Sequence, residues 1–252
     1  MRILTWNVAG RVKRHPEQAA AVLSAAPDVV CLQEVTATTL PLWRAALGEA
    51  GLEHTVTPLD TFTPPKPRRL GVLIASRAPL GEIAIEAELP WRERAVAARV
   101  GGALDVVCTH SPISPSPELA KVRHHEALYG WLRDREGPIV LAGDLNTPRR
   151  DLPDGDVLTF AHASNGTLRP ERGERWHAAE SALVHTLRAQ HGWSDPFLDG
   201  PERTWTFARN RGGWRLDHIL VRDVTVLARA YAHEWRIEGL SDHSALVADL
   251  SL

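Results

Sequence analysis

The chain has 252 residues, of which 44% are hydrophobic and 24% are charged. These proportions are ordinary for a folded protein with a sizeable core, and they exclude a chain that is mostly disordered. The formal net charge of −2 excludes the broad basic surface of a protein that coats nucleic acid without specificity. Any contact with nucleic acid must therefore be local, and the length favours a single domain over residues 1–252.

The N-terminal part predicts a strand, a helix and a second strand, over residues 2–7, 15–26 and 28–34. A helical crossover of this kind joins parallel strands, so Asn7 and Glu34 are expected at the same edge of one sheet. A second helix is expected over 39–50. The proline-rich stretch 58–67 then predicts a surface loop that could flank a cleft.

Four strand-like runs follow, at 70–76, 82–88, 94–100 and 103–109. Their spacing is typical of an antiparallel sheet, with Gly101 and Gly102 as a tight turn between the last two. His110 ends this series.

Helices then interrupt the strands twice. One runs from Pro117 to Gly137, and the other carries an apolar stripe from Trp176 to Leu187. The apolar run 139–142 between them leads to Asp144, and the remaining strands are expected at 204–207, 215–221, 225–233 and 245–250. This order predicts an α/β (α+β) fold, a four-layer sandwich of two mixed β-sheets flanked by helices.

The cysteines and the N-terminal residues bear on the compartment. Cys31 and Cys108 fall within expected strands, and two free, buried thiols are the default for a cytosolic protein. Met1 and Arg2 lead directly into the first strand, and no apolar stretch reaches transmembrane length. We expect a cytoplasmic protein without a membrane anchor, and the sequence indicates no obligate protein partner.

Several expected strands end in an acid or an amide, and this edge is where open α/β sheets build their sites. Hydrolysis of a phosphodiester requires a cation, an aligned water and donors for the developing charge. Glu34 is a hard oxygen ligand suited to Mg²⁺ or Mn²⁺, and Asp242 could bind the metal directly or through its waters. Asp144 could hold or deprotonate the attacking water, and Asn146 could donate to a phosphate oxygen.

Two histidines complete this candidate site. His243 is the candidate for direct contact with the scissile phosphate, and Asp217 is the expected carboxylate that fixes its tautomer and favours its charged form. His110 could stabilise the leaving-group side. The other histidines lack the ligand spacing of zinc sites, and His124 and His125 are expected on a solvated or partly buried helix face.

Tryptophans and arginines supply the candidate substrate contacts. Trp205 and Trp214 fall near the expected site loops, where they could stack on bases. Six loop arginines could meet phosphates, although solvated loop charge is an equal alternative: Arg68, Arg69, Arg149, Arg150, Arg209 and Arg211.

Six short motifs occur in a fixed order: Trp6-Asn7, Leu32-Gln33-Glu34, Thr109-His110, Gly143-Asp144-Leu145-Asn146, Arg215-Leu216-Asp217-His218 and Ser241-Asp242-His243. Together they make the chain resemble the endonuclease/exonuclease/phosphatase superfamily, with its DNase I-like fold, from residue 3 to about residue 250. The resemblance implies a four-layer α/β sandwich and a divalent-metal phosphoesterase.

The resemblance also assigns roles to individual residues. It implies that Glu34 is a metal ligand and that Asp144 acts on the water. It places Asn7 and Asn146 at the phosphate, makes Asn7 a further candidate for the metal, and pairs His243 with Asp217.

Two positions distinguish branches of the superfamily. Abasic-site endonucleases similar to exonuclease III usually carry a polar or acidic residue where this chain has Ala9, and a tyrosine where it has His110. The chain is thus similar to the histidine-bearing branch, which includes DNase I, sphingomyelinases and tyrosyl-DNA phosphodiesterases. The missing export signal disfavours the secreted members.

We therefore expect a Mg²⁺- or Mn²⁺-dependent phosphodiesterase, an intracellular nuclease that acts on DNA or RNA. One alternative is a phosphodiesterase or phosphatase of a small phosphorylated molecule or a phospholipid headgroup, which the near-neutral charge supports. Another is an inactive phosphate-binding scaffold, which the intact set of acids, amides and histidines disfavours.

Overall fold

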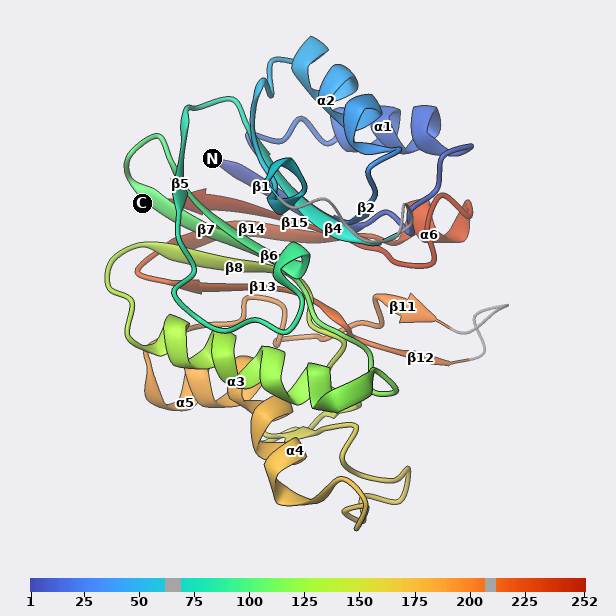
Figure 1. Ribbon diagram of the computed structural model, residues 1–252, viewed down its shortest axis with the longest axis vertical. Coiled ribbons are helices and arrows are strands. Elements are labelled where there is room, and N and C mark those ends of the chain that lie inside the picture. The colour runs from blue at the N-terminus through green and yellow to red at the C-terminus, as the bar shows by residue number, and fades with distance from the viewer. Residues whose placement is uncertain (62–68, 207–211) are drawn as a thin grey trace.

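Two β-sheets pack face to face, with helices on their outer faces, in a computed structural model that describes residues 1–61, 69–206 and 212–252 (Figure 1). Within these ranges, the first sheet has six strands in the order β14-β15-β1-β2-β4-β3, and the second has five in the order β13-β8-β7-β6-β5. Both sheets mix parallel and antiparallel pairs. The predicted four-layer α/β sandwich is thus confirmed.

The strands of the first sheet are β1 (Arg2–Asn7), β2 (Val29–Val35), β3 (His54–Val56), β4 (Gly71–Ser76), β14 (Thr225–Ala232) and β15 (Ala245–Ser251). Its outer face is covered by α1 (His15–Ser24), α2 (Leu40–Glu49) and α6 (His233–Ile237).

The strands of the second sheet are β5 (Leu80–Ile83), β6 (Ala95–Val100), β7 (Leu104–His110), β8 (Ile139–Asp144) and β13 (Asp217–Arg222). Its outer face is covered by α3 (Ala120–Arg133) and by a helical segment made of α4 (Gly173–Ser181), a π-helical turn (Ala182–Thr186) and α5 (Leu187–Gln190). Short 3₁₀ turns span Pro58–Asp60, Arg92–Arg94 and Pro117–Leu119.

Two small ribbons complete the described structure. They pair β9 (Arg150–Asp151) with β10 (Val157–Leu158), and β11 (Trp205–Thr206) with β12 (Gly213–Trp214).

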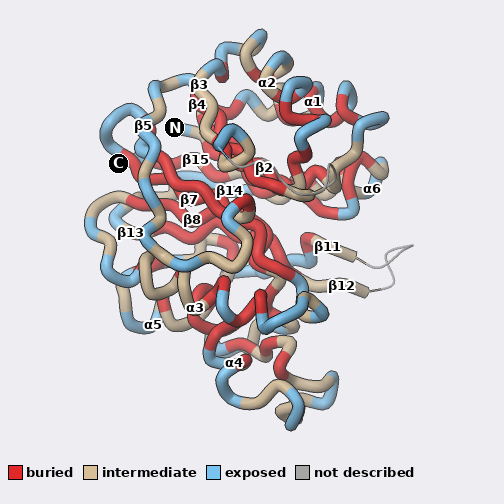
Figure 2. The backbone as a smooth tube through the Cα atoms, viewed as in Figure 1, coloured by how far each residue is buried: buried red, intermediate tan, exposed pale blue. Residues whose placement is uncertain are grey.

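The main core lies between the two sheets, where the buried residues concentrate (Figure 2). Ile3 and Cys31 of the first sheet pack there with Val106 and Val140 of the second. The intervening residues of each strand, such as Trp6, face the other way and pack beneath the helices, because side chains alternate along a strand. Fully buried strands of this kind hold their ends in fixed positions.

The strand directions place the ends of several strands together. β1 runs parallel to β2, so that Asn7 pairs with Gln33 at their carboxyl ends. β7 runs parallel to β8 with His110 opposite Asp144, and the antiparallel β13 begins with Asp217 opposite the same Asp144. These ends lie away from both chain termini, on the side of the β11–β12 ribbon (Figure 1).

The predicted antiparallel series is divided between the two sheets, and this expectation was wrong. β4 pairs with β2 and β3, whereas β5, β6 and β7 belong to the other sheet, and β5 begins and ends earlier than the predicted run 82–88. β4 is buried on both faces and fits an inner strand, while β5 is a partly exposed edge. Local alternation does not specify which partner a strand takes. The expected turn is present, because Gly101 and Gly102 both have positive φ between β6 and β7.

Other expectations differ in detail. The short elements β3, β9, β10 and α6 were not predicted, since each is too short to show a periodicity. His124 and His125 are fully buried rather than solvated, because His124 packs against Thr109 of β7 and His125 lies where α4 packs against α3. Cys31 and Cys108 are free and buried, as expected.

Parts of two predicted elements, residues 62–67 of the proline-rich loop and residue 207 of a strand, lie outside the described residues. Among the helices of the described ranges, none combines the length and the apolar character needed to cross a bilayer.

A buried ion pair joins the second helical layer to the loop after β8. Lys121 Nζ lies 2.5 Å from Glu180 Oε1 and donates to the backbone oxygen of Asn146 at 2.7 Å. The Glu180 carboxylate also accepts from Trp176 Nε1 at 2.7 Å and from the backbone N–H of Phe160 at 2.6 Å. Burial lowers the pKa of Lys121, and the neighbouring Glu180 offsets part of that shift.

Replacing Lys121 by methionine should lower the free energy of unfolding by about 3–5 kcal/mol, because Glu180 would remain buried without its cation. Urea unfolding measures this difference. The matched control is Arg175→Met, which removes an exposed ion pair between α4 and Glu126 of α3 and should change the unfolding midpoint little. Equal effects of the two substitutions would contradict a special role for the buried pair.

Candidate active site

A cavity of about 410 Å³ opens at the end of the sheets where these strands meet. Its lining includes most of the sequence-predicted site residues: Glu34, His110, Asp144, Asn146, Trp205, Trp214, Asp242 and His243. Asn7 and Asp217 are fully buried and hydrogen-bonded to members of this lining. The structure thus brings all ten predicted residues to one place.

Asn7 connects the two sheets at the floor of this cavity. Its Nδ2 donates to Glu34 Oε1 at 3.2 Å, from the same sheet, and to Asp144 Oδ2 at 3.0 Å, from the other sheet. Its Oδ1 accepts from the backbone N–H of Ala9 at 3.0 Å. The amide is therefore held in one orientation, in which it positions both carboxylates.

Glu34 reaches the cavity through an irregularity in β2. The pairing of β2 with β4 shifts register between Gln33 and Val35, and Glu34 has a φ of +63°. A bulge of this kind re-aims a side chain at the end of a strand. Burial raises the pKa of Glu34, and the Asn7 hydrogen bond offsets part of that shift.

Asp144 is buried at the end of β8 and accepts two hydrogen bonds. The backbone N–H of Asn146 donates to its Oδ1 at 2.9 Å, and Asn7 donates to its Oδ2. Burial and the neighbouring carboxylate of Asp217 together raise the pKa of Asp144 to about 7. A carboxyl group with such a pKa is suited to exchange protons with water near neutral pH.

His243 and Asp217 form a buried pair across the two sheets. His243 Nδ1 donates to Asp217 Oδ2 at 2.8 Å, and Thr204 Oγ1 fixes Asp217 by accepting from its backbone N–H at 3.1 Å. Burial alone would lower the pKa of His243, but Asp217 and then Asp144 raise it to about 10. The imidazole is therefore charged at neutral pH, with its Nε2 3.9 Å from Asp144 Oδ2.

His110, in contrast, lies in surroundings that favour its neutral form. Burial, followed by the charge of Arg94, lowers the pKa of His110 well below its usual value. Arg94 Nη1 forms a short hydrogen bond with His110 Nδ1, and because a guanidinium only donates, Nδ1 must accept. The proton of the neutral ring is thus on Nε2, which lies 3.6 Å from Asp144 Oδ2 and 3.8 Å from Glu34 Oε1.

Sequence reasoning missed Arg94, although a signal for it exists. The hairpin between β6 and β7 pairs Val100 with Leu104 and Ala95 with Thr109, so its register continues to Arg94 beside His110. Counting back from the Gly101-Gly102 turn would have found this neighbour.

Two tryptophans form an aromatic wall of the cavity. Trp205 and Trp214 are paired across the β11–β12 ribbon and stack with ring centroids 5.1 Å apart and an interplanar angle of 3°. Trp205 Nε1 donates to Asp242 Oδ2 at 3.2 Å, which connects this wall to the acidic edge. Asn146, another lining residue, donates through its Nδ2 to the backbone oxygen of Ser111 at 2.8 Å.

The loop arginines lie in different surroundings. Arg149 lines the cavity, together with Arg169 and Arg172, which sequence reasoning did not select. Arg69 is paired with Glu93. The others that were considered are Arg150, which lies in a neighbouring pocket, and Arg68, Arg209 and Arg211, which lie outside the described residues.

Two groups of side chains in the site are candidates to hold a cation. Ligand atoms of Asp144, Asp217 and His243 lie within 4.8 Å of one another, but a charged imidazole bonded to Asp217 cannot offer a lone pair to a metal. Glu34 and Asp242 line the same cavity, and among the described residues neither forms an ion pair with a lysine or an arginine. Hard carboxylate oxygens of this kind fit Mg²⁺ or Mn²⁺.

Comparison with known proteins assigns the family. The sequence model of the Endonuclease/Exonuclease/phosphatase family matches residues 4–243. The chain belongs to this family. A member of the Endonuclease/Exonuclease/phosphatase family is a hydrolase of phosphoric ester bonds, which confirms the class of enzyme that the sequence predicts.

Solved structures show that this family member has the DNase I-like fold. It is similar to an AP endonuclease from Archaeoglobus fulgidus, with a TM-score of 0.74, 21% identity and full coverage of both chains. It is also similar to the 3′ phosphatase NExo from Neisseria bound to product DNA hairpin, with a TM-score of 0.71, 25% identity and full coverage of both chains. A humanized D. rerio TDP2 matches with a TM-score of 0.69 and 16% identity over 100% of this chain and 99% of that chain. No curated protein sequence matched this chain.

In ¹⁵N NMR spectra at pH 6.5, where an ordinary histidine is half charged, His110 should be neutral with its proton on Nε2. Replacing Arg94 by methionine should raise the pKa of His110 and populate the Nδ1-protonated tautomer, since Nδ1 loses its donor. Arg92→Met, in the same turn but exposed, is the matched control and should leave the spectrum of His110 unchanged. A charged or Nδ1-protonated His110 in the unaltered protein would contradict this interpretation.

Proposed function

We propose that the chain is a phosphodiesterase that requires Mg²⁺ or Mn²⁺ and hydrolyses phosphodiester bonds of DNA or RNA. The observation that carries this proposal is the set of contacts at the floor of the cavity, in which Asn7 bonds both Glu34 and Asp144, and His243 bonds Asp217. A charged histidine, a carboxyl group with a pKa of about 7 and a neutral histidine thus face the same space. Hydrolysis of a phosphodiester can use each of these groups.

Glu34 and Asp242 are the residues that we propose as metal ligands. A bound divalent cation would neutralise phosphate charge and lower the pKa of coordinated water. Asn7 fixes the Glu34 carboxylate through its Nδ2, so we assign Asn7 to positioning the ligand and the water-activating acid. Its own Oδ1 is occupied by the N–H of Ala9.

His243 is the residue that we assign to the scissile phosphate. Its Nδ1 is bonded to Asp217, so Nε2–H is the donor that remains to meet a non-bridging oxygen. The positive charge that Asp217 and Asp144 maintain on the ring would stabilise the negative charge of the transition state.

Asp144 and His110 are assigned to the movement of protons. Asp144 would accept the proton of the attacking water, for which a pKa of about 7 is suitable. His110, which is neutral with its proton on Nε2, would donate a hydrogen bond at the leaving-group side, and Asn146 would orient a phosphate oxygen nearby. Each role uses the protonation state that the surroundings favour.

A nucleic acid is the substrate class that we favour. Relatives of the same fold are described as an AP endonuclease and as a 3′ phosphatase bound to a DNA hairpin. The stacked Trp205 and Trp214 offer a flat aromatic surface of the kind on which bases stack. We also propose that the chain forms a single domain. Because Cys31 and Cys108 stay free, we propose that the enzyme works in the cytoplasm.

A small phosphorylated molecule is the second candidate substrate, and the formal charge of −2 favours it. Binding of a polynucleotide weakens steeply as salt rises, because bound phosphates release counterions, whereas binding of a molecule with one phosphate depends weakly on salt. A salt series therefore separates the two candidates.

Asp144→Asn and His243→Ala should each lower the rate of hydrolysis of plasmid DNA, RNA and bis-p-nitrophenyl phosphate by at least ~10²-fold. The first removes the proton acceptor and the second removes the charged donor. Asp154→Asn, an exposed loop acid, is the matched control and should keep the unaltered rate. Rates like that of the unaltered enzyme in both site variants would dismiss these roles.

Removing divalent cations with a chelator should abolish hydrolysis, and adding Mg²⁺ or Mn²⁺ should restore it. Glu34→Gln should raise the metal concentration needed for half-maximal activity by at least ~10-fold, because loss of support around a metal site typically costs 10–100-fold in affinity. Full activity in chelator would exclude a metal-dependent reaction.

A further inference from the structure

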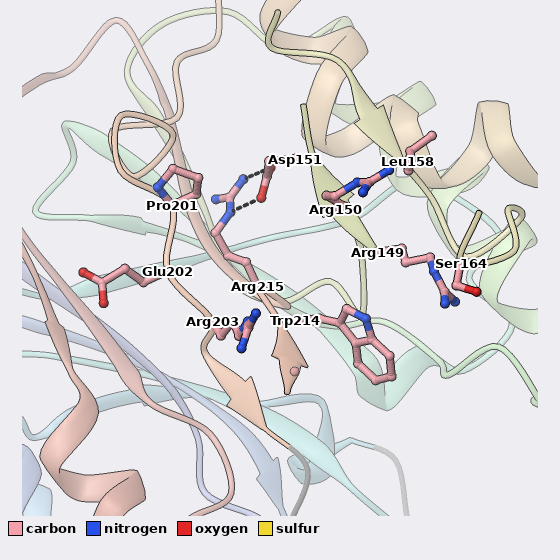
Figure 3. A pocket seen from close by; sticks show the side chains of 11 residues that line it. Arg149, Arg150, Asp151, Leu158, Ser164, Pro201, Glu202, Arg203, Trp214 and Arg215 are labelled. Atoms are coloured by element: carbon pink, nitrogen blue, oxygen red, sulfur yellow. Dashed lines mark hydrogen bonds and ion pairs between the residues drawn. The ribbon is translucent and has the colours of Figure 1, made fainter. Parts of the chain in front are cut away.

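A second pocket of about 330 Å³ lies beside the catalytic cavity and has no role in the reaction described above (Figure 3). Four arginines line it, namely Arg149, Arg150, Arg203 and Arg215. Arg149 and Trp214 line both this pocket and the catalytic cavity, so the two spaces adjoin.

The arginines of this pocket differ in whether their charge is neutralised. Arg215 is satisfied, because it makes two hydrogen bonds with Asp151, at 2.6 and 3.0 Å (Figure 3), and one with Asp195 at 2.8 Å. Arg149, Arg150 and Arg203 form no ion pair or side-chain hydrogen bond with any residue in the described ranges.

The charge of the lining is therefore positive. Its four arginines meet the carboxylates of Asp151 and Glu202 in the lining and that of the buried Asp195 behind it, which leaves an excess of one positive charge. Of these carboxylates, Asp151 is bonded to Arg215 and Glu202 is bonded to His233 Nε2 at 3.0 Å. In a molecule with a net charge of −2, a pocket with unpaired guanidinium groups is a local site for an anion.

The position of Trp214 indicates which anion fits. Its ring stacks on Trp205 toward the catalytic cavity and meets Phe160 edge-on, with centroids 5.0 Å apart. Because Trp214 lines both spaces, an anion in the pocket lies next to one in the catalytic cavity, as consecutive phosphates do along a nucleic acid strand. A molecule with one phosphate could not use both sites.

The backbone that carries these arginines is anchored to the catalytic residues. Arg203 precedes Thr204, whose Oγ1 accepts from the N–H groups of Leu216 and Asp217 at 2.9 and 3.1 Å. Arg150 is the first residue of β9. The next residue, Asp151, bonds Arg215, and this contact ties β9 to the segment that follows Trp214. The pocket and the catalytic cavity therefore keep a fixed spacing.

We propose that this arginine pocket binds backbone phosphates next to the scissile one, and so selects a polynucleotide strand over an isolated phosphodiester. The proposal rests on the proposed phosphodiesterase function and names the substrate of the same site. Guanidinium groups suit this role because they bind phosphate oxygens in a bidentate manner. The scissile phosphate occupies the catalytic cavity. Arg150 and Arg203, whose side chains run in different directions in Figure 3, each meet a separate neighbouring phosphate of the strand.

The experiment compares one substrate that has a single phosphodiester, a dinucleoside monophosphate, with a single-stranded oligonucleotide. The variant is Arg150→Gln with Arg203→Gln, since both side chains are exposed and the fold does not depend on them. It should lower kcat/KM for the oligonucleotide by at least ~10-fold more than for the dinucleoside monophosphate. Arg123→Gln, an exposed arginine on α3 outside both linings, is the matched control and should leave both values unchanged.

A binding measurement without catalysis accompanies the kinetics. In chelator, fluorescence anisotropy of a labelled oligonucleotide gives Kd as a function of salt. The double variant should weaken binding by ~10- to ~100-fold and lower the slope of log K against log salt by about 1.4, since two phosphate contacts are lost and each contributes about 0.7 for a single strand.

Three results would be decisive against the subsite or the function. Equal loss of kcat/KM for both substrates would overturn the subsite, because the arginines would then act on the scissile phosphate or on stability. An unchanged salt slope in the double variant would overturn it as well. Failure of the unaltered enzyme to cleave any phosphodiester would instead refute the proposed function, and the anisotropy measurement would still decide whether the pocket binds phosphates.

Discussion

Two polar contacts across the gap between the sheets hold the candidate site together. Asn7 Nδ2 reaches Asp144 Oδ2 at 3.0 Å, and His243 Nδ1 reaches Asp217 Oδ2 at 2.8 Å, with one partner of each contact from either sheet. They are possible because the packed core aligns the ends of β1 and β8 and the starts of β13 and β15 at one edge. A change in the spacing of the sheets would break both contacts together, so the geometry of the site depends on the core.

The same arrangement gives two histidines opposite protonation states. His243 lies between the carboxylates of Asp217 and Asp144, which outweigh its burial and keep it charged, whereas His110 lies against Arg94 and stays neutral. This contrast is the basis of the roles that we propose, with His243 at the phosphate and His110 at the leaving group. It also explains why we propose Glu34 as the metal ligand in preference to the cluster that contains His243. Environment, more than residue type, distinguishes the two rings.

How much the sequence could predict depended on whether a feature is local. The strand–helix–strand pattern was enough to predict that Asn7 and Glu34 lie at the same edge of a sheet. The need of a catalytic histidine for a carboxylate partner was enough to suggest Asp217 for His243. Both contacts are present. The sheet to which residues 71–76 belong was not predictable, because strand pairing is decided by burial on both faces. The burial of His125 depends on α4, a helix that begins more than forty residues downstream. The arginine pocket joins two loops that share no motif, so only the fold reveals it.

The most direct test of the central claim is anomalous diffraction from crystals soaked in Mn²⁺. Our account predicts a manganese peak bonded to an oxygen of Glu34, with His243 Nδ1 still bonded to Asp217 and no nitrogen in the coordination sphere. A manganese ion held by His243 and Asp217 would contradict it, because the imidazole would then be a metal ligand and could not act as the charged donor to the phosphate.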